Sequence, residues 1–368
     1  MADVSYPTFP IFAFIGFVIV LVPLPWHLQA WNSGTCLYIV WTAMACLNQF
    51  VNSVVWHGNV INHAPVWCDI STRLMIGIAV AIPSASLCIN RRLYKIASVQ
   101  TVSITRKDKQ KAVLIDMIIG VGIPVTQMVL QYIVQGHRFD IIEDIGCYPV
   151  TYITPPAFVL VLVWPLVIGL ISAIFCVLTL KAFLERRAQF SELLLTHSSL
   201  TMTRYFRLMA LASADLLCTV PYSAYGIYLN LRDVPISPWK GWADTHFNFS
   251  KVGQITAAAW HTNRNVAVAL ELSRWVIPVC AILFFGFFGF ADEAQRNYSR
   301  VFAFCVSRIP FTTSVKITTA KSKARHYYRT SASRMTASGT LPIYVSRTYQ
   351  SRKNSVDSSM ENAIVLSP

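Results

Sequence analysis

The feature that most constrains this chain is a long apolar run in its first hundred residues. Residues 74–89 carry no charged side chain, and the wider segment 69–90 is mostly apolar. A bilayer core about 30 Å thick needs roughly 20 apolar residues in a helix, because each residue rises about 1.5 Å. The segment is therefore predicted to cross a membrane as the axial helix of a bundle. Arg91, Arg92 and Lys95 follow it, which predicts that this end faces the cytoplasm.

Six further windows have the same character, so the expected fold class is an all-α integral membrane protein, a seven-transmembrane helix bundle in residues 1–290. The chain is 54% hydrophobic and only 13% charged, whereas soluble domains are about 25% charged. No basic segment or small-residue cleavage site accompanies the first span, so we expect it to be retained and not removed as a signal peptide. The predicted spans lie near residues 8–26, 36–56, 69–90, 112–134, 157–181, 206–230 and 266–290.

The orientation of the bundle follows from the positions of its 31 Lys and Arg residues, most of which come after spans three, five and seven. The positive-inside rule then places the N-terminus outside and the C-terminus in the cytoplasm. A cytoplasmic face that meets anionic lipid and protein explains the net charge of +14. No nucleic-acid partner is expected.

In this topology only two of the nine cysteines are extracellular, Cys68 and Cys147. A disulfide between them, from the top of span three to the second outer loop, is favoured over two free thiols. Beside Cys68, Asp69 and Arg73 lie four residues apart on one helical face and are expected to neutralise each other. No Cys/His spacing resembles a metal site, and no cofactor is expected.

The second predicted span carries Asn48, Asn52 and His57, which can share a helical face. Polar groups at membrane depth are expected to face the bundle and not the lipid. For the two asparagines we favour interhelical hydrogen bonds over ligand contact. His57 lies near the outer mouth, where a ligand contact and a structural contact are equally well supported.

Two later spans carry ionisable residues. Asp215 lies in the middle of span six, where a carboxylate is either functional or hydrogen-bonded to a neighbouring helix. Pro221 removes a backbone hydrogen bond and predicts a bend or hinge. In span seven, Glu271 and Arg274 lie three residues apart, and a structural salt bridge is the favoured interpretation.

The second outer loop, residues 135–154, carries several acidic residues in front of Cys147. An acidic lid held by a cystine suits a basic or amine-bearing ligand, and a solvated acidic loop explains the pattern equally well. The candidate ligand-binding residues at the outer end of the bundle are His57, Asp69, Arg73, Asp140, Glu143, Asp144, Tyr225, Tyr228 and Trp260.

The remaining segments suggest modification sites. The last outer loop, residues 231–265, is rich in aromatic side chains, which an interfacial belt would explain, and Asn248 begins a glycosylation sequon there. Residues 291–310 are predicted to form an amphipathic helix on the inner leaflet, with Cys305 as a candidate palmitoylation site. Residues 311–368, rich in Ser, Thr, Lys and Arg, are predicted to be a disordered tail open to kinases.

Catalytic signatures are missing from the sequence. It contains no zinc-protease, nucleophile-elbow, Walker or kinase motif, so we do not expect an enzyme. A proton- or ion-linked transporter that uses Asp215 and Glu271 is the alternative from another class, although the spans show no internal repeat. Seven spans with the N-terminus outside and prolines in spans three to seven favour a signal-transducing receptor.

Several short motifs then carry a resemblance that runs in order from about residue 6 to residue 300. They are Pro23-Leu24-Pro25-Trp26-His27, Asn48-Gln49-Phe50, Cys68-Asp69-Ile70, Pro83-Ser84-Ala85-Ser86-Leu87-Cys88-Ile89 with Arg91-Arg92-Leu93, Glu143-Asp144-Ile145-Gly146-Cys147, Arg204-Tyr205-Phe206-Arg207-Leu208-Met209 and Glu271-Leu272-Ser273-Arg274-Trp275. In these motifs the chain resembles the fungal a-factor-type mating pheromone receptors, a branch of the class D G-protein-coupled receptors, and the basidiomycete members in particular.

The resemblance implies a multi-pass receptor in the plasma membrane. Its ligand would be a secreted, C-terminally farnesylated and carboxymethylated peptide, and its partner a heterotrimeric G protein that starts a mating kinase cascade. The family lacks the Asp/Glu-Arg-Tyr and Asn-Pro-x-x-Tyr switches of the large animal receptor class, and so does this chain. The candidate G-protein contacts are Arg91, Arg92, Arg204 and Arg207. The sequence leaves open whether the receptor forms a homodimer.

Overall fold

The structure, a computed structural model, describes residues 6–98, 105–185, 202–232 and 236–290, and the side chains of 202–204 and 215 lie outside that description. The helical elements are α1 Thr8–Leu21, α2 Leu24–Gln29, α3 Ser33–Val55, α4 Pro65–Ser98, α5 Arg106–Met117, η1 Ile118–Gly122, α6 Ile123–Gln131, η2 Tyr132–Val134, α7 Pro155–Ala157, η3 Phe158–Leu162, α8 Trp164–Glu185, α10 Met202–Arg232, α11 Trp242–Thr245, α12 Ala257–Thr262 and α13 Arg264–Phe288. The strands are β1 Phe139–Ile142, β2 Gly146–Tyr148 and β3 Val252–Ile255.

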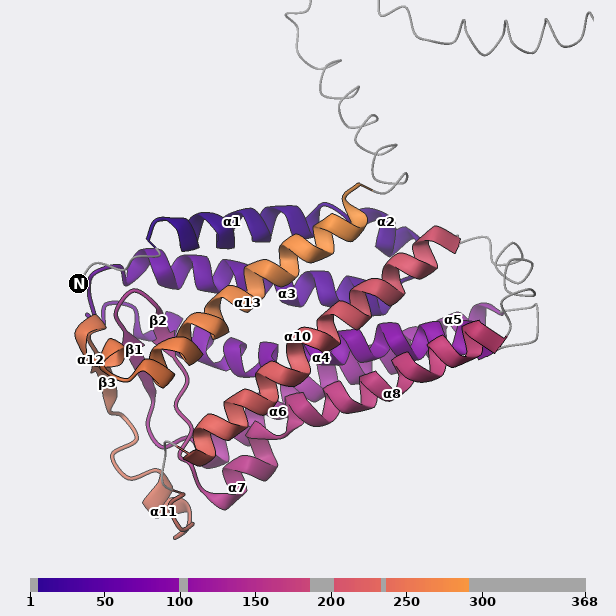
Figure 1. Ribbon diagram of the computed structural model, residues 1–368. Coiled ribbons are helices and arrows are strands. Elements are labelled where there is room, and N and C mark those ends of the chain that lie inside the picture. Colours follow the sequence, from indigo (N-terminus) through magenta and orange to yellow (C-terminus); the bar gives the residue numbers. More distant parts are fainter. Residues whose placement is uncertain (1–5, 99–104, 186–201, 233–235, 291–368) are drawn as a thin grey trace, which may run out of the picture. The chain divides into compact units, whose positions relative to one another are not determined.

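The long helices run side by side as a bundle (Figure 1). Six described segments are long and apolar enough to cross a membrane: Thr8–Gln29, Ser33–Val55, Pro65–Ser98, Arg106–Val134, Trp164–Glu185 and Arg264–Phe288. Each overlaps a predicted span, with ends that differ by several residues. The predicted span 206–230 falls in α10, which has 31 residues but is not among those six because polar residues lower its hydropathy.

Prolines shape several of these helices. The first predicted span is divided, because Pro23 and Pro25 end α1 and start the short helix α2. Short π-helical turns, η1 and η3, precede Pro124 and Pro165 and take up the irregularity in the backbone. Pro221 lies within α10, which continues on both sides of it. A proline inside a membrane helix is tolerated where neighbouring groups satisfy the freed backbone carbonyl.

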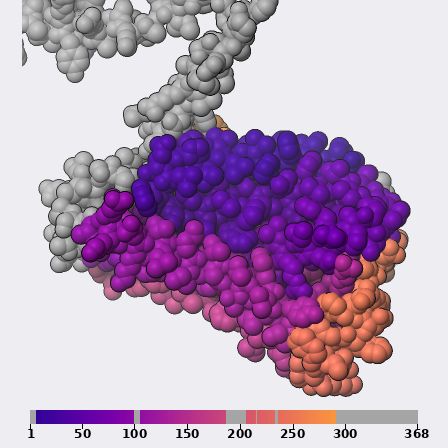
Figure 2. All heavy atoms as spheres, turned by 180° about the vertical axis from the view of Figure 1, so that it is seen from behind, coloured from indigo at the N-terminus to yellow at the C-terminus, as the bar shows by residue number. Residues whose placement is uncertain are grey.

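Helix α4 occupies the centre of the bundle. Of its most apolar window, 72% is buried, against 22% for α8. It packs against α3, α6, α8 and α10, and its side chains Ile78, Ile82 and Ile89 belong to the largest apolar core. Seen from behind, α1 to α4 form a continuous band above the later helices (Figure 2). The orange residues at one end of the molecule belong to the part of the chain that follows α10. The expectation that this helix is axial is met.

A small sheet covers one end of the bundle, where the sequence analysis expected only loops. Its strand order is β2-β1-β3, with β1 antiparallel to β2 and parallel to β3. The parallel pair joins two loops that are far apart in sequence, with Ile141 opposite Gln254. We call residues 135–154 together with 252–262 the lid, and the bundle end that they cover the lid end. The all-α prediction missed this element because three- and four-residue strands carry almost no periodic signal.

Candidate functional site

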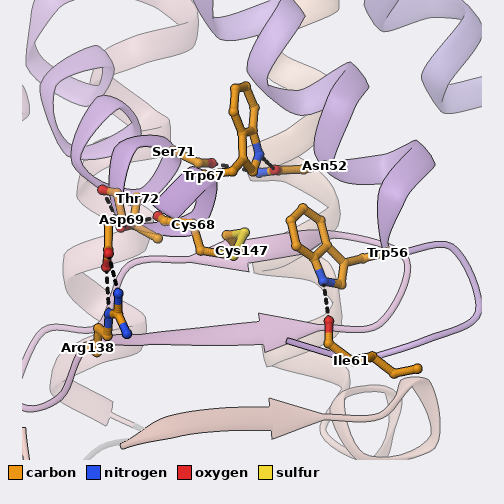
Figure 3. The surroundings of a disulfide bond; sticks show 10 residues. All are labelled: Asn52, Trp56, Ile61, Trp67, Cys68, Asp69, Ser71, Thr72, Arg138 and Cys147. Carbon is orange, nitrogen blue, oxygen red and sulfur yellow. Dashed lines mark hydrogen bonds and ion pairs between the residues drawn. A yellow bond between two sulfur atoms is a disulfide. The ribbon is translucent and has the colours of Figure 1, made fainter. Parts of the chain in front are cut away.

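A disulfide ties the lid to the central helix. Cys68, in the first turn of α4, is bonded to Cys147 in β2. Both residues are fully buried near Trp56 (Figure 3), and Phe139 and Ile141 belong to the same apolar cluster. The indole nitrogen of Trp56 donates a hydrogen bond of 3.0 Å to the carbonyl of Ile61, which holds the adjoining loop against the same cluster. The cystine thus lies in an apolar layer between lid and bundle.

The predicted pair between Asp69 and Arg73 is wrong. Asp69 accepts two hydrogen bonds, of 2.9 and 2.6 Å, from the guanidinium of Arg138 in the lid (Figure 3). These bonds raise the pKa of Arg138 above its ordinary value. Arg73 instead donates to the side-chain oxygens of Gln131 and Gln135. A planar guanidinium that meets a carboxylate with two parallel bonds is a stronger partner than one on the same helix.

The three lid carboxylates are all engaged within the protein. Asp144 is 3% exposed, and its Oδ1 lies 2.9 Å from both His57 Nδ1 and the backbone nitrogen of Gly58. Glu143 accepts a 2.6 Å bond from the backbone nitrogen of Ala257, at the start of α12. Asp140 Oδ1 lies 2.7 Å from His137 Nε2. A basic ligand would therefore have to compete with internal partners for each carboxylate.

Two other predicted ligand residues support the lid. His57 stacks on Tyr6 with ring centroids 3.5 Å apart. Trp260 is 3% exposed and donates from its indole nitrogen to the carbonyl of Glu143. Tyr148, in β2, is half-buried, and its partial removal from solvent raises the pKa of its phenol although a hydrogen bond with Ser273 of α13 acts in the opposite direction. The lid is thus packed onto the bundle and not held over an open mouth.

The predicted asparagines of α3 behave differently from each other. Asn52 donates 2.9 Å to Ser71 Oγ and accepts 2.7 Å from the indole of Trp67, both on α4 (Figure 3). These are the interhelical bonds that the sequence analysis favoured. Asn48 is 2% exposed, and neither its amide nitrogen nor its oxygen has a hydrogen-bond partner among the described residues.

The predicted salt bridge in α13 is confirmed. Arg274 Nη2 lies 2.7 Å from Glu271 Oε1, and the indole nitrogen of Trp275 donates 3.1 Å to the same carboxylate. The guanidinium also lies 4.7 Å from the ring centroid of Phe9 in α1 and donates 3.4 Å to the carbonyl of Asp144. Arg274 therefore joins α13, α1 and the lid, and it leaves Glu271 neutralised where a transporter would need it free.

A cavity of about 200 Å³ lies between α4, η3, α8, α10 and α13. Its walls are mostly apolar and include Ile78, Ile82, Gly226, Ile227 and Ile277. Sequence reasoning missed it and chose other residues of α10. Tyr225 and Tyr228 stack on each other with centroids 6.4 Å apart, and neither lines the cavity, whereas Tyr222 does. The one sequence signal was Gly226, a glycine inside the predicted span 206–230.

At the opposite end of the bundle, two predicted G-protein contacts are held by the protein itself. Arg91 Nη2 lies 2.6 Å from Asp116 Oδ1, and this carboxylate, 1% exposed, also accepts a hydrogen bond from Ser33. Together, Arg91, Asp116 and Ser33 join α4, α5 and α3. Arg92 donates to the carbonyl of Trp31. No local sequence signal pairs Asp116 with Arg91, although Asp116 is one of the few acids within a predicted span.

Other predicted sites are placed less fully. Arg207 lies half-buried near the start of α10, whereas the side chains of Arg204 and Asp215 are outside the description. Pro221 is exposed on α10. Asn248 is exposed and has a left-handed backbone, with φ of 53°. Cys305, with the rest of 291–310 and the tail 311–368, lies outside the described residues.

The chain is similar to known receptors over most of the helix bundle. The sequence profile of the family "Pheromone A receptor" matches residues 8–309. The Pheromone B alpha 3 receptor of Schizophyllum commune is 52% identical over 303 residues, which are 82% of this chain and 48% of that protein. Pheromone receptor 1 of Ustilago hordei is 33% identical over 304 residues, 81% of this chain and 85% of that protein.

The similarity extends to a distant relative. The Pheromone a factor receptor of Saccharomyces cerevisiae is 25% identical over 291 residues, 78% of this chain and 59% of that protein. The chain spans about half the length of the Schizophyllum relatives. Because the family profile covers the described bundle from α1 to α13, the chain belongs to the pheromone A receptor family.

Proposed function

We propose that this chain is a G-protein-coupled receptor for a secreted, C-terminally farnesylated mating peptide, located in the plasma membrane. The observation that carries the proposal is the family match across the whole helix bundle. The apolar cavity between α4, α8, α10 and α13 adds support, because a ligand with a hydrocarbon tail needs such a space. No described feature favours ion transport in the same way.

The bundle crosses the membrane seven times in this proposal, with the N-terminus outside and the C-terminus in the cytoplasm. Helix α10 supplies the additional span, since 31 residues are more than the roughly 20 needed to cross a bilayer. The basic segments after spans three, five and seven support the orientation. Under it, the lid and Asn248 are extracellular, so Asn248 is accessible for glycosylation and Cys305 for cytoplasmic palmitoylation.

Activation would be a shift between two packings of the bundle. Helices α8 and α10 are the elements that we expect to move, because α8 is among the least buried of the apolar segments and both border the cavity. Arg204 and Arg207 lie near the start of α10, at the end opposite the lid, and are the proposed G-protein contacts. Arg91 and Arg92 would contact a G protein only after their bonds to Asp116 and Trp31 open.

The test is a G-protein-linked reporter in cells that express the full chain. A panel of synthetic peptides that end in farnesyl-cysteine methyl ester is applied, and the same peptides without farnesyl are the matched controls. We expect dose-dependent signalling to at least one farnesylated peptide and none to its control. Silence towards every farnesylated peptide, with surface expression verified, would contradict the proposal.

Orientation needs a separate measurement, because signalling does not report it. Epitope tags at the two ends are stained in intact and in permeabilised cells. The N-terminal tag is expected to stain in intact cells and the C-terminal tag only after permeabilisation. Staining of both tags in the same compartment would reject an odd number of spans, and with it the receptor topology.

A further inference from the structure

The glycines of the helix bundle fall into two groups, and Gly226 belongs to the smaller one. A Cβ built on Gly77 would lie 1.9 Å from Met128, and one on Gly120 would lie 2.6 Å from Leu37. Those glycines let neighbouring helices approach closely. A Cβ on Gly226 would meet no atom within 4 Å. Close packing therefore does not explain a glycine at this position.

Gly226 lowers the stability of its helix without a packing benefit. It lies inside the 31-residue helix α10, where glycine weakens a helix relative to alanine because the unfolded chain gains more freedom. Its φ is not in the left-handed region, so no unusual backbone conformation requires it. It does line the cavity of about 200 Å³. The absent side chain leaves that part of the space open.

The cavity wall is suited to hydrocarbon. Ile82, Ile227 and Ile277 contribute branched apolar side chains to it. Two of the polar side chains at its edge have hydrogen-bond partners within the protein: Asn230 donates 2.8 Å to the carbonyl of Gly226, and Tyr222 hydrogen-bonds with Ser273. Apolar cavities of about 150 Å³ stay dry and bind small hydrocarbons such as benzene. This space is larger, so it can take part of a branched chain.

We propose that the cavity binds the distal isoprene units of the pheromone's farnesyl tail, and that Gly226 sets the length of tail that fits. This inference rests on the proposed function and adds the location of the tail and a residue that selects it. Discrimination by such a pocket comes from filling volume, because each missing or extra hydrocarbon unit changes the fit. A side chain at position 226 would occupy the space of the end of the tail.

The experiment uses the purified full chain and a photoreactive farnesyl-cysteine methyl ester as the probe. Labelling is competed with the geranyl, farnesyl and geranylgeranyl cysteine methyl esters, which differ by one isoprene unit each. The variants are Gly226→Leu, which reduces the cavity, and Ile82→Ala, which enlarges it. Gly286→Leu is the matched control, because Gly286 is also a helical glycine with nothing within 4 Å of its Cβ but is absent from the cavity wall.

In the wild type we expect farnesyl to compete best and the labelled peptide to contain residues 219–230 or 276–280. Gly226→Leu is expected to weaken farnesyl competition about tenfold relative to geranyl. Ile82→Ala is expected to shift the preference towards geranylgeranyl, and Gly286→Leu to leave the order unchanged. Thermal unfolding of each variant verifies that the protein is folded. Because leucine forms helices better than glycine does, neither Gly→Leu change is expected to weaken its helix.

Two results would overturn this inference. One is an unchanged farnesyl-to-geranyl ratio in Gly226→Leu, and the other is labelling confined to the lid. Both leave the proposed function intact, since a farnesylated peptide could then signal from another site. Conversely, labelling of the cavity by the probe without any reporter response to farnesylated peptides would contradict the proposed function and support the binding site.

Discussion

Two helix pairs in this bundle have similar lengths but are joined by different chemistry. Across α3 and α4, Asn52 bonds to Ser71 and Trp67, and the apolar windows of the two helices are 61% and 72% buried. Across α8 and α10, the contact is mainly apolar, with Cys176 Sγ 3.3 Å from Ser213 Oγ. The window of α8 is 22% buried, and the cavity lies beside it.

The difference indicates which part of the bundle is fixed. Buried polar bonds fix one relative position of two helices, because a shifted helix would leave its donors and acceptors unpaired in an apolar setting. Apolar contacts beside a cavity allow more than one packing at a smaller cost. We therefore regard α3 and α4, tied to the lid by the cystine, as the rigid frame, and α8 and α10 as the movable wall.

The largest expected effect comes from the covalent link of the frame to the lid. Cys147→Ser removes a bond that closes a loop with a sequence separation of 79. Loop closure of this size is worth about 4 kcal/mol of unfolding free energy. We expect a large fall in the thermal unfolding temperature of the purified protein and in its surface fraction. Cys176→Ser on the movable wall is the control. An equal fall in the unfolding temperature of that variant would remove the distinction between the rigid frame and the movable wall.

The ion pair between Asp116 and Arg91, at the other end of the frame, comes next. Asp116→Asn leaves the guanidinium of Arg91 without its carboxylate. Breaking a fully buried pair costs about 3–5 kcal/mol, and because Arg91 is 26% exposed we expect a loss at the lower end, about 3 kcal/mol. Replacing both partners, Arg91→Met with Asp116→Leu, should restore part of the loss because no charge is left unpaired. Asp108→Asn, at an exposed carboxylate of the same helix, is the control. A double variant no more stable than Asp116→Asn would show that the charges themselves do not matter.

How much of the structure could be predicted from the sequence depends on how far apart in the chain the interacting residues lie. The apolar spans, the axial helix and the Glu271–Arg274 pair follow from local composition and spacing, so they were predictable. The partner of Asp69 was not, because Arg138 lies 69 residues away and meets it only through the folded lid. The cystine was predictable by elimination, since the predicted topology left two cysteines outside. The cavity depends on side chains from separate helices and had one weak local sign, Gly226.

The third prediction contrasts two asparagines on the same helix of the frame. Asn52→Leu removes two interhelical bonds and leaves Ser71 and Trp67 unpaired, which should cost about 2 kcal/mol of stability. Asn48→Leu removes an amide with no partner among the described residues, so we expect the stability to stay level or rise. Thermal unfolding of the two variants in parallel decides this. Equal losses would mean that Asn48 has a polar partner in the membrane.

An effect of Asn48→Leu on signalling would have a separate meaning. If the variant is as stable as the wild type but responds less to a farnesylated peptide, the amide finds its partner only in the active packing, and Asn48 is part of the switch. If both stability and response are unchanged, the residue has no role in either state. Asn52→Leu is not informative here, because a loss of folded protein lowers the response without any change in the switch.

The smallest expected effect lies on the movable wall. Pro221 is exposed within a continuous α10, so Pro221→Ala adds one backbone donor without leaving a void, and we expect a stability change below about 1 kcal/mol. Its effect should appear in the dose response to a farnesylated peptide, as a shift of several-fold, if the proline lets α10 bend between two packings. Ala224→Leu, at another exposed position of α10, is the control. Identical dose responses for Pro221→Ala and the wild type would exclude Pro221 as a hinge, and the movable wall would then have to shift as a rigid helix.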